Sequence, residues 1–178
     1  MQRMSTVLAL DLASVSGWAV GEPGCKPEHG SIRFAKPGAS HEAIFAKAMD
    51  WADEIIAMCK PRLIVWEAPL PGFKSGKTTS DVTTILFGLP AIVGASAYRQ
   101  QVFDCRKADT GAVRHHFIGC NPKRAKAKPM VVRQCFAMGW EVADDNEADA
   151  LAVWSYMCSL IDPRLALAPT PLFGRRSA

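Results

Sequence analysis

Long hydrophobic runs, closely spaced cysteines and a large excess of charge are all missing from this sequence of 178 residues. No apolar run approaches the roughly 20 residues that a helix needs to span a bilayer, so we expect no contact with a membrane. No signal peptide is expected either, because the first apolar stretch is short and Asp11 interrupts it. The six cysteines form no C-x-x-C pair, which argues against a zinc site or a disulfide framework. We therefore predict a cytoplasmic protein with reduced thiols.

The charge is mild in total but unevenly distributed. The formal net charge is +4, and this small excess says little about binding partners. Six Lys and Arg side chains lie in 114–133, and five Asp and Glu side chains follow in 141–149. This order suits a protein that holds a polyanion and acts on it with metal ions. Two solvated faces explain the charges equally well.

The hydrophobic pattern predicts one α/β domain over residues 1–162, followed by a loose tail over 163–178 that contains Pro and Arg. Two proline signals are expected to shape the helices: a kink or restart near 88–90, and Pro129 in a helical first turn. Apolar runs and helical spacing place the elements as follows: strands at 7–12, from 18, at 31–35, 63–67 and 102–104, and helices at 41–60, 80–99, 108–117, 128–138 and 146–159. The first three strands are predicted to form an antiparallel meander within a mixed sheet.

Three acidic residues occupy positions where apolar side chains are expected. Asp11 falls within the first buried strand, Glu67 ends another, and Asp149 lies in a very apolar helix. A buried carboxylate costs several kcal/mol unless a partner compensates it. Each acid has an ordinary explanation on its own: Glu67 as a solvated strand end, or Asp149 as the partner of an arginine. Together they favour divalent metal ions, because carboxylate oxygens are ligands for Mg²⁺, and two ions can promote hydrolysis of a phosphodiester.

Four segments resemble the RuvC-type Holliday-junction resolvases, in the style of phage or prophage members. Residues 8–19 look like the opening strand and turn of that family, and 64–67 like its second acidic strand. Residues 145–152 are similar to its final helix, in which an Asp-Ala-Leu-Ala run carries the last acid. The small-residue helix of the family resembles 87–98. The similarity covers nearly the whole chain, in order.

The resemblance implies an RNase H-like fold with a five-stranded mixed sheet, a homodimer, and Mg²⁺ or Mn²⁺ as cofactor. Asp11, Glu67 and Asp149 match the metal-binding acids of the family, and we expect two ions in each active site. The family often has an Asp or His three residues before the last acid, where this chain has Asn146. We favour Asp145, four residues before, as the fourth ligand, because carboxylate binds Mg²⁺ more strongly than amide. Asn146 could instead supply its carbonyl oxygen, and Asp144 or Asp145 could be only the helix N-cap.

Two sets of residues are candidates for binding DNA. The loop after Glu67 offers charges for phosphates and an aromatic ring for stacking, although a packing role for that ring is about equally plausible. A basic run before the predicted helix at 128–138 could neutralise phosphates, with a solvated surface as the alternative. The candidates are Phe73, Lys74 and Lys77 in the loop, and Lys123, Arg124, Lys126 and Lys128 in the basic run.

The sequence therefore predicts a hydrolase: a magnesium-dependent crossover junction endodeoxyribonuclease that cuts four-way or branched DNA in recombination and repair. An RNA-directed nuclease of the same fold, for example one that processes ribosomal RNA precursors, remains an alternative because the metal chemistry is the same. An ATP-binding kinase-like domain also opens with an Asp-containing strand, but it needs two such domains. A non-catalytic DNA-binding relative is disfavoured by the intact acids.

Overall fold

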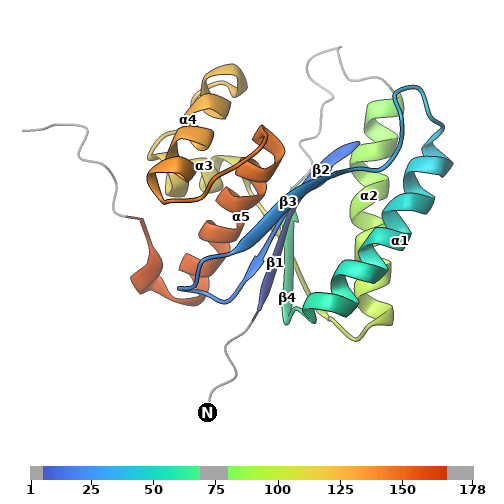
Figure 1. Cartoon of the computed structure of the whole chain (residues 1–178), viewed down its shortest axis with the longest axis horizontal. Helices are drawn as coiled ribbons and strands as arrows, with labels where there is room; N and C mark the ends of the chain where they lie inside the picture. The colour runs from blue at the N-terminus through green and yellow to red at the C-terminus, as the bar shows by residue number, and fades with distance from the viewer. Residues whose placement is uncertain (1–5, 69–79, 168–178) are drawn as a thin grey trace, which may run out of the picture.

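The sheet has five strands in the order β3-β2-β1-β4-β5, with helices on both faces (Figure 1). The computed structural model describes residues 6–68 and 80–167. The strands are β1 (Val7–Asp11), β2 (Val15–Gly21), β3 (Glu28–Arg33), β4 (Leu63–Glu67) and β5 (Asp104–Ala108). The helices are α1 (His41–Cys59), α2 (Ser80–Arg99), α3 (Thr110–Ile118), α4 (Arg124–Ala137), α5 (Asp145–Ile161) and the short 3₁₀ helix η2 (Pro163–Leu165).

The sheet is mixed, as the order of elements predicts. Strands β1, β2 and β3 pair antiparallel, whereas β4 and β5 run parallel to β1. Strands β1 and β4 lie in the middle of the sheet and are covered on both faces, which explains why each reads as a continuous apolar run. The predicted α/β class is confirmed, and so is the five-stranded mixed sheet with three antiparallel strands followed by parallel ones.

Alternate residues of β1 face two separate hydrophobic layers. Leu8 and Leu10 pack with α1 and α2, and Val7 and Ala9 pack with α3, α4 and α5. All four side chains are fully buried. Figure 1 shows the two helical groups on opposite sides of the sheet. Because both layers cover the sheet, polar side chains of the central strands can reach solvent only at the strand ends.

The bounds of helices α1 and α2 agree with the prediction to within one residue. Helix α1 begins after Ser40, whose side chain accepts a hydrogen bond from the Ala43 amide, as expected for an N-cap. Helix α2 is assigned as one helix from Ser80 to Arg99 with Pro90 inside it, so the predicted restart near 88–90 does not occur. A Cβ atom on Gly88 would lie 2.4 Å from the ring of Phe45, so a larger residue there would have to displace that ring of α1.

Four element boundaries differ from the prediction. Strand β2 begins at Val15 rather than at 18, because residues 15–17 already pair with β3 and Gly17 also pairs with β1. Strand β3 spans 28–33 rather than 31–35, and β5 spans 104–108 rather than 102–104. Both are edge strands with several exposed residues, so they lack the apolar pattern that marks β1 and β4. Helix α4 begins at Arg124 rather than 128, which places Pro129 in its second turn instead of its first. Its first residues are exposed and basic, so they carry no hydrophobic period.

Helix α2 and the end of the described chain also depart from expectation. By length and composition alone, Asp81–Arg99 is apolar enough to cross a bilayer, and 22% of its most apolar window is buried. The prediction that no apolar run approaches that length is therefore wrong for α2. The chain also remains packed beyond residue 162: it forms η2, and Leu165 and Leu167 contact the α5 side of the core.

Candidate active site

Asp11 and Glu67 occupy the same edge of the sheet because they end two neighbouring parallel strands. The register pairs Leu10 of β1 with Trp66 of β4, so the next residue on each strand is an acid. The preceding residues are buried, whereas both acids are partly accessible. Side chains at the carboxyl ends of parallel strands meet at one edge, where ligands commonly bind in open α/β sheets.

Asp149 reaches this edge from the first turns of α5, which pack very closely on the sheet. Gly17 on β2 pairs with Asp11. A Cβ atom at Gly17 would lie 1.9 Å from the carbonyl oxygen of Asn146, so no larger residue fits without moving the helix or the strand. The absence of a side chain at Gly17 thus lets the start of α5, with Asn146 and Asp149, lie beside the end of β1.

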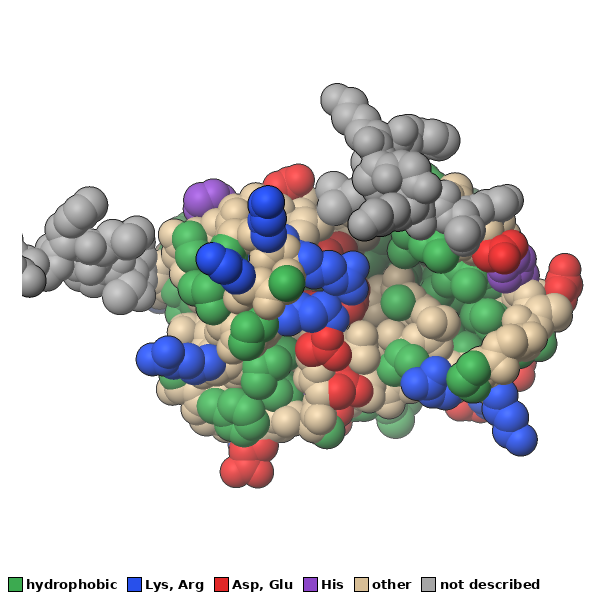
Figure 2. Space-filling model, turned by 90° about the horizontal axis from the view of Figure 1, so that it is seen from above, with side chains coloured by type: hydrophobic (Ala, Val, Ile, Leu, Met, Phe, Trp, Pro, Cys, Tyr) green, Lys and Arg blue, Asp and Glu red, His purple; other side chains and the backbone are tan. Residues whose placement is uncertain are grey.

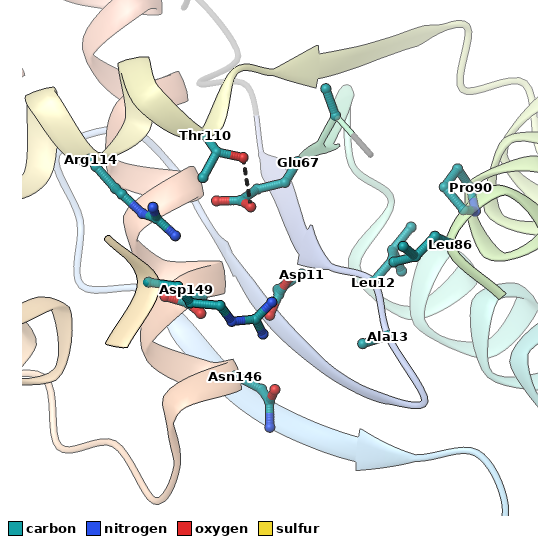
Figure 3. Close-up of a pocket in the computed structure, with 12 residues that line it drawn as sticks. Asp11, Leu12, Ala13, Glu67, Leu86, Pro90, Thr110, Arg114, Asn146 and Asp149 are labelled. Carbon is teal, nitrogen blue, oxygen red and sulfur yellow. Dashed lines mark hydrogen bonds between the residues drawn. The ribbon is translucent and has the colours of Figure 1, made fainter. Parts of the chain in front are cut away.

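One cavity of about 410 Å³ joins the three acids. Its lining residues are Asp11, Leu12, Ala13, Glu67, Ala68, Leu86, Pro90, Thr110, Arg114, Arg124, Asn146 and Asp149. Figure 3 shows Asp11, Glu67 and Asp149 pointing toward a common space from β1, β4 and α5. In Figure 2 the molecule is viewed onto this edge, and Lys and Arg side chains gather beside the hollow between the two helical layers.

The ionised form of each of the three carboxyl groups is unfavourable in this cavity. Burial, together with the nearby Asp149 and Glu67 carboxylates, raises the pKa of Asp11 to about 7. Burial and Asp149 raise the pKa of Glu67, and burial raises the pKa of Asp149. Three acids that resist ionisation in one cavity are characteristic of functional sites, where a cation or a proton-transfer reaction uses the shifted groups.

Cationic side chains partly offset this repulsion. Lys128 and Arg124 oppose the rise in the pKa of Asp11, Lys128, Arg114 and Arg124 oppose that of Asp149, and Arg114 and Arg124 oppose that of Glu67. Arg124 was predicted as a DNA-binding residue, and the structure places it in the cavity lining. Arg114 was noted only as part of the basic block, since no sequence pattern links it to the acids.

Thr110 was missed entirely at the level of the sequence. Its hydroxyl donates a 3.1 Å hydrogen bond to Glu67, and the residue is buried. Thr110 follows β5, the strand next to β4, so its place at the same sheet edge is a consequence of the topology. A correct boundary for β5 would have pointed to it, because the predicted strand ended several residues too early.

The start of α5 distinguishes the two candidates for a fourth ligand. Asn146 lines the cavity, whereas Asp145 is not among the lining residues and pairs with Lys128 of α4. Asp144 is the N-cap and accepts hydrogen bonds from the amides of Asn146 and Glu147, both at 2.9 Å. Asn146 and Asp145 precede Asp149 by three and four residues, so both share a helix face with it. Asp145 is drawn to Lys128 of the neighbouring α4, and Asn146 is left to face the cavity.

The remaining candidates for DNA contact have different surroundings. Lys123 and Lys126 are exposed at the start of α4, beside the cavity residue Arg124. Lys128 is partly buried in its pair with Asp145. The loop candidates Phe73, Lys74 and Lys77 lie outside the described residues.

The oxygen atoms of the side chains that line the cavity are suitable ligands for a hard divalent cation, although these side chains do not yet surround one position. Among residues 6–68 and 80–167, no three His, Cys, Asp or Glu side chains are close enough together to hold a metal ion. The oxygen donors facing the cavity, three carboxylates and the Asn146 amide, are nevertheless of the kind that Mg²⁺ and Mn²⁺ accept. A cation would relieve the repulsion that raises the three pKa values, so modest side-chain movement toward it would be favourable.

No protein-family model matches the chain, and no curated protein matches its sequence. Its structure is similar to that of T. thermophilus RuvC in complex with a Holliday junction substrate, with a TM-score of 0.69 and 15% identity over 91% of this chain and 98% of that chain. Thermus thermophilus RuvC is similar with a TM-score of 0.64 and 15% identity, covering 90% and 96% of the two chains. The yeast mitochondrial Holliday junction resolvase Ydc2 is similar with a TM-score of 0.62 and 12% identity, covering 87% and 78%.

These similarities establish that the chain has the fold of the RuvC-type resolvases. The predicted resemblance to that family is confirmed at the level of three-dimensional structure. At 12–15% identity the likeness concerns the fold, and the chemistry has to be argued from the cavity itself.

Proposed function

We propose that this protein is a metal-dependent endonuclease that hydrolyses phosphodiesters in branched DNA, including four-way junctions. One observation carries the proposal: three carboxyl groups with raised pKa values line a single cavity at the end of β1 and β4. The fold supports the choice of substrate, since it is shared with a RuvC that was solved in complex with a Holliday junction. Recombination and repair in the cytoplasm are the setting in which such a substrate arises.

Asp11, Glu67 and Asp149 would hold Mg²⁺ or Mn²⁺, with two ions as the expected number. Asn146, rather than Asp145, would supply the additional oxygen, because only Asn146 lines the cavity. When bound, such ions lower the pKa of a water molecule and stabilise the charge of a leaving oxygen. In the hydrolysis, water attacks the phosphorus in line and the 3′ oxygen leaves.

The protein groups around the acids have separate tasks in this reaction. Thr110 holds one oxygen of Glu67 through its hydrogen bond and so restricts the rotation of that carboxylate. Arg114 and Arg124 line the same cavity and would neutralise the scissile phosphate as its charge develops. Lys123 and Lys126 are exposed beside them and would contact phosphates farther along a DNA arm. Phe73, Lys74 and Lys77 are proposed as further DNA contacts on the strength of the sequence alone.

A cleavage assay tests the nuclease proposal. The wild-type protein, Asp11→Asn and the control Asp50→Asn are incubated with a synthetic four-way junction, a linear duplex and an RNA/DNA hybrid, in Mg²⁺ or in EDTA. Asp50 is an exposed acid of α1 that does not line the cavity. We expect paired nicks in the junction that require Mg²⁺ and fall at least roughly 100-fold in Asp11→Asn but not in the control. Cleavage of the hybrid alone would change the substrate class to RNA, and no cleavage of any substrate would refute the proposal.

We further propose that the active protein is a homodimer that associates through the exposed side of α2. Phe87 and Tyr98 on this side are 50% and 72% exposed, and Ala91 and Ala95 lie exposed between them. We call these four residues the α2 stripe. Their spacing places them along one side of the helix. Phe103 extends the stripe, since its ring lies 5.4 Å from that of Tyr98.

The order of sizes in the α2 stripe points to a second copy of the same chain. Large, small, small and large side chains follow one another, so a two-fold axis between Ala91 and Ala95 would let the two helices approach at the alanines, with the aromatic rings at both ends of the contact. A Cβ atom at the adjacent Gly94 would meet nothing within 4 Å, so a second backbone can come close. Leu86 and Pro90 of the same helix line the cavity, and pairing through α2 would therefore bring two active sites onto one junction.

Sedimentation analysis of Phe87→Glu tests the dimer. Phe87→Glu buries a charge in the proposed contact and should shift the protein to a monomer, whereas Met58→Glu, at an exposed position of α1 outside that contact, should not. A monomeric wild-type protein at micromolar concentration would contradict the dimer without affecting the assignment of the acids.

A further inference from the structure

A set of polar contacts outside the cavity ties the edge strand β3 to the start of α5. His29 Nδ1 lies 3.0 Å from Glu147 Oε2, and the same oxygen accepts a 3.1 Å hydrogen bond from the Ala143 amide. Ser31 Oγ donates a 2.7 Å hydrogen bond to Asp144. We call the four side chains His29, Ser31, Asp144 and Glu147 the β3–α5 clamp.

Glu147 is an unusual residue for an ordinary surface contact. It is only 8% exposed, and the side chain of its partner His29 is 14% exposed. Its neighbour Ala148 is fully buried. A buried polar pair adds little to stability compared with well-packed apolar residues, and its best-attested use is to specify one arrangement over others. We therefore ask which arrangement of β3 and α5 the clamp specifies.

The clamp lies in register with the active-site acid across the sheet. Ser31 of β3 pairs with Gly17 of β2, and Gly17 pairs with Asp11 of β1. The carbonyl of Asn146 sits directly over Gly17. The first turn of α5 is therefore held from the β3 side by Asp144 and Glu147, while Asn146 and Asp149 of the same turns line the cavity next to Asp11.

The hydrogen bonds at Asp144 show that this end of α5 is well fixed. Asp144 accepts hydrogen bonds from the Ser31 hydroxyl at 2.7 Å and from the amides of Asn146 and Glu147, both at 2.9 Å. Asp144 thus caps the helix and joins it to β3 at the same time. A rotation or slide of α5 would have to break the contact of Asp144 with Ser31 and that of Glu147 with His29 together.

We infer that Glu147 and His29 are positioning residues for the proposed nuclease: they set the rotation and height of α5 so that Asp149 and Asn146 face Asp11 across the cavity. This inference rests on the proposed function. Neither residue lines the cavity, so both would act through α5 and touch neither metal nor DNA. Misplacement of a reacting group by about 1 Å can cost roughly 100-fold in rate, so a small shift of the helix is enough to matter.

Three variants separate positioning from simple stability: Glu147→Leu, which removes the polar contacts; Glu147→Gln, which keeps an acceptor for His29 and Ala143; and His29→Leu, which removes the partner on β3. Glu141→Gln, at an exposed position outside the clamp and the cavity, is the matched control. For each we would measure kcat and KM on a four-way junction, the affinity for Mn²⁺ by calorimetry, and the unfolding midpoint in denaturant.

In Glu147→Leu we expect kcat and Mn²⁺ affinity to fall about 10- to 100-fold, with KM for the junction unchanged. Glu147→Gln should recover most of both, and His29→Leu should shift both in the same direction, which keeps the test valid should Glu147→Leu not fold. Altered unfolding midpoints with wild-type kcat and Mn²⁺ affinity would overturn the inference and leave a merely structural clamp. A wild-type protein that neither cleaves nor binds Mn²⁺ would instead overturn the proposed function itself, and the positioning role with it.

Discussion

Replacing the buried acid Asp11 by Asn should stabilise the metal-free protein at alkaline pH, although it should abolish cleavage. The pKa of Asp11 is about 7 in the folded protein, above the ordinary 3.8, so the folded state binds this proton more tightly than the unfolded chain does. By linkage, the free energy of unfolding falls as the pH rises from about 4 to about 7, and the full penalty remains above that range. Asp11→Asn removes the penalty because asparagine does not ionise.

The size of the effect follows from the two pKa values. One pKa unit corresponds to about 1.4 kcal/mol, so the difference between 3.8 and about 7 sets an upper bound of about 4 kcal/mol at pH 8. Well below pH 3.8 the contribution vanishes, because Asp11 is then protonated in the unfolded chain as well as in the folded state. The stabilising effect of Asp11→Asn should therefore grow between about pH 4 and about pH 7 and stay constant above that range.

Urea unfolding in EDTA at several pH values measures this directly. Asp50→Asn, at an exposed position of α1, is the control and should change stability by no more than about 0.5 kcal/mol at any pH. Saturating Mg²⁺ should stabilise the wild-type protein more than Asp11→Asn, because the ion binds the folded state through this carboxylate. An Asp11→Asn variant that is less stable than wild type at pH 8 in EDTA would refute the reasoning about strain in the acid cluster.

Four further predictions concern the same cavity and its surroundings. Lowering the pH from 8 to 6 should raise the Mg²⁺ concentration needed for half-maximal cleavage about tenfold, because protons compete with the ion at Asp11, whose pKa is about 7; a requirement that does not change with pH would contradict this. Gly17→Ala should cost about 1–3 kcal/mol of stability in denaturant unfolding, because its Cβ would lie 1.9 Å from the Asn146 carbonyl, and kcat should fall as α5 shifts. Asp145→Asn should change the Mg²⁺ requirement little while Asn146→Asp lowers it, and a metal titration of cleavage that gives the reverse order would restore Asp145 as the fourth ligand. Lys126→Ala should weaken junction binding and reduce the slope of log affinity against log salt by about 1, and equal slopes for variant and wild type would place Lys126 outside the DNA contact.

The elements that the sequence predicted well are those buried on both sides or amphipathic along their length. Strands β1 and β4 and helices α1 and α5 carry clear apolar patterns, because their surroundings in the core are uniform. Strand β5 and the first turn of α4 face solvent over much of their length, so their residues follow no period that could reveal them. The error in β5 also concealed Thr110, since its place at the sheet edge follows from where that strand ends.

The exposed side of α2 is a second feature that could not be predicted from the sequence. Its apolar composition was visible in the sequence, but one helix face packs on α1 while the other remains open. Composition alone does not show which apolar residues a fold leaves uncovered, because burial depends on the elements that pack around them. Only the structure shows that Phe87 and Tyr98 lie together on the open side.

By itself, the sequence determined the fold class and the identity of Asp11, Glu67 and Asp149 as the unusual acids, because a carboxylate within an apolar run has a cost that any folded structure must meet. Only the tertiary structure decided that the three acids line one cavity, that Arg114 and Thr110 join them, and that Asn146 faces the cavity while Asp145 pairs with Lys128. These contacts join residues far apart in the chain. They depend on how α3, α4 and α5 pack on the sheet, and spacing along one helix cannot encode what lies across from it.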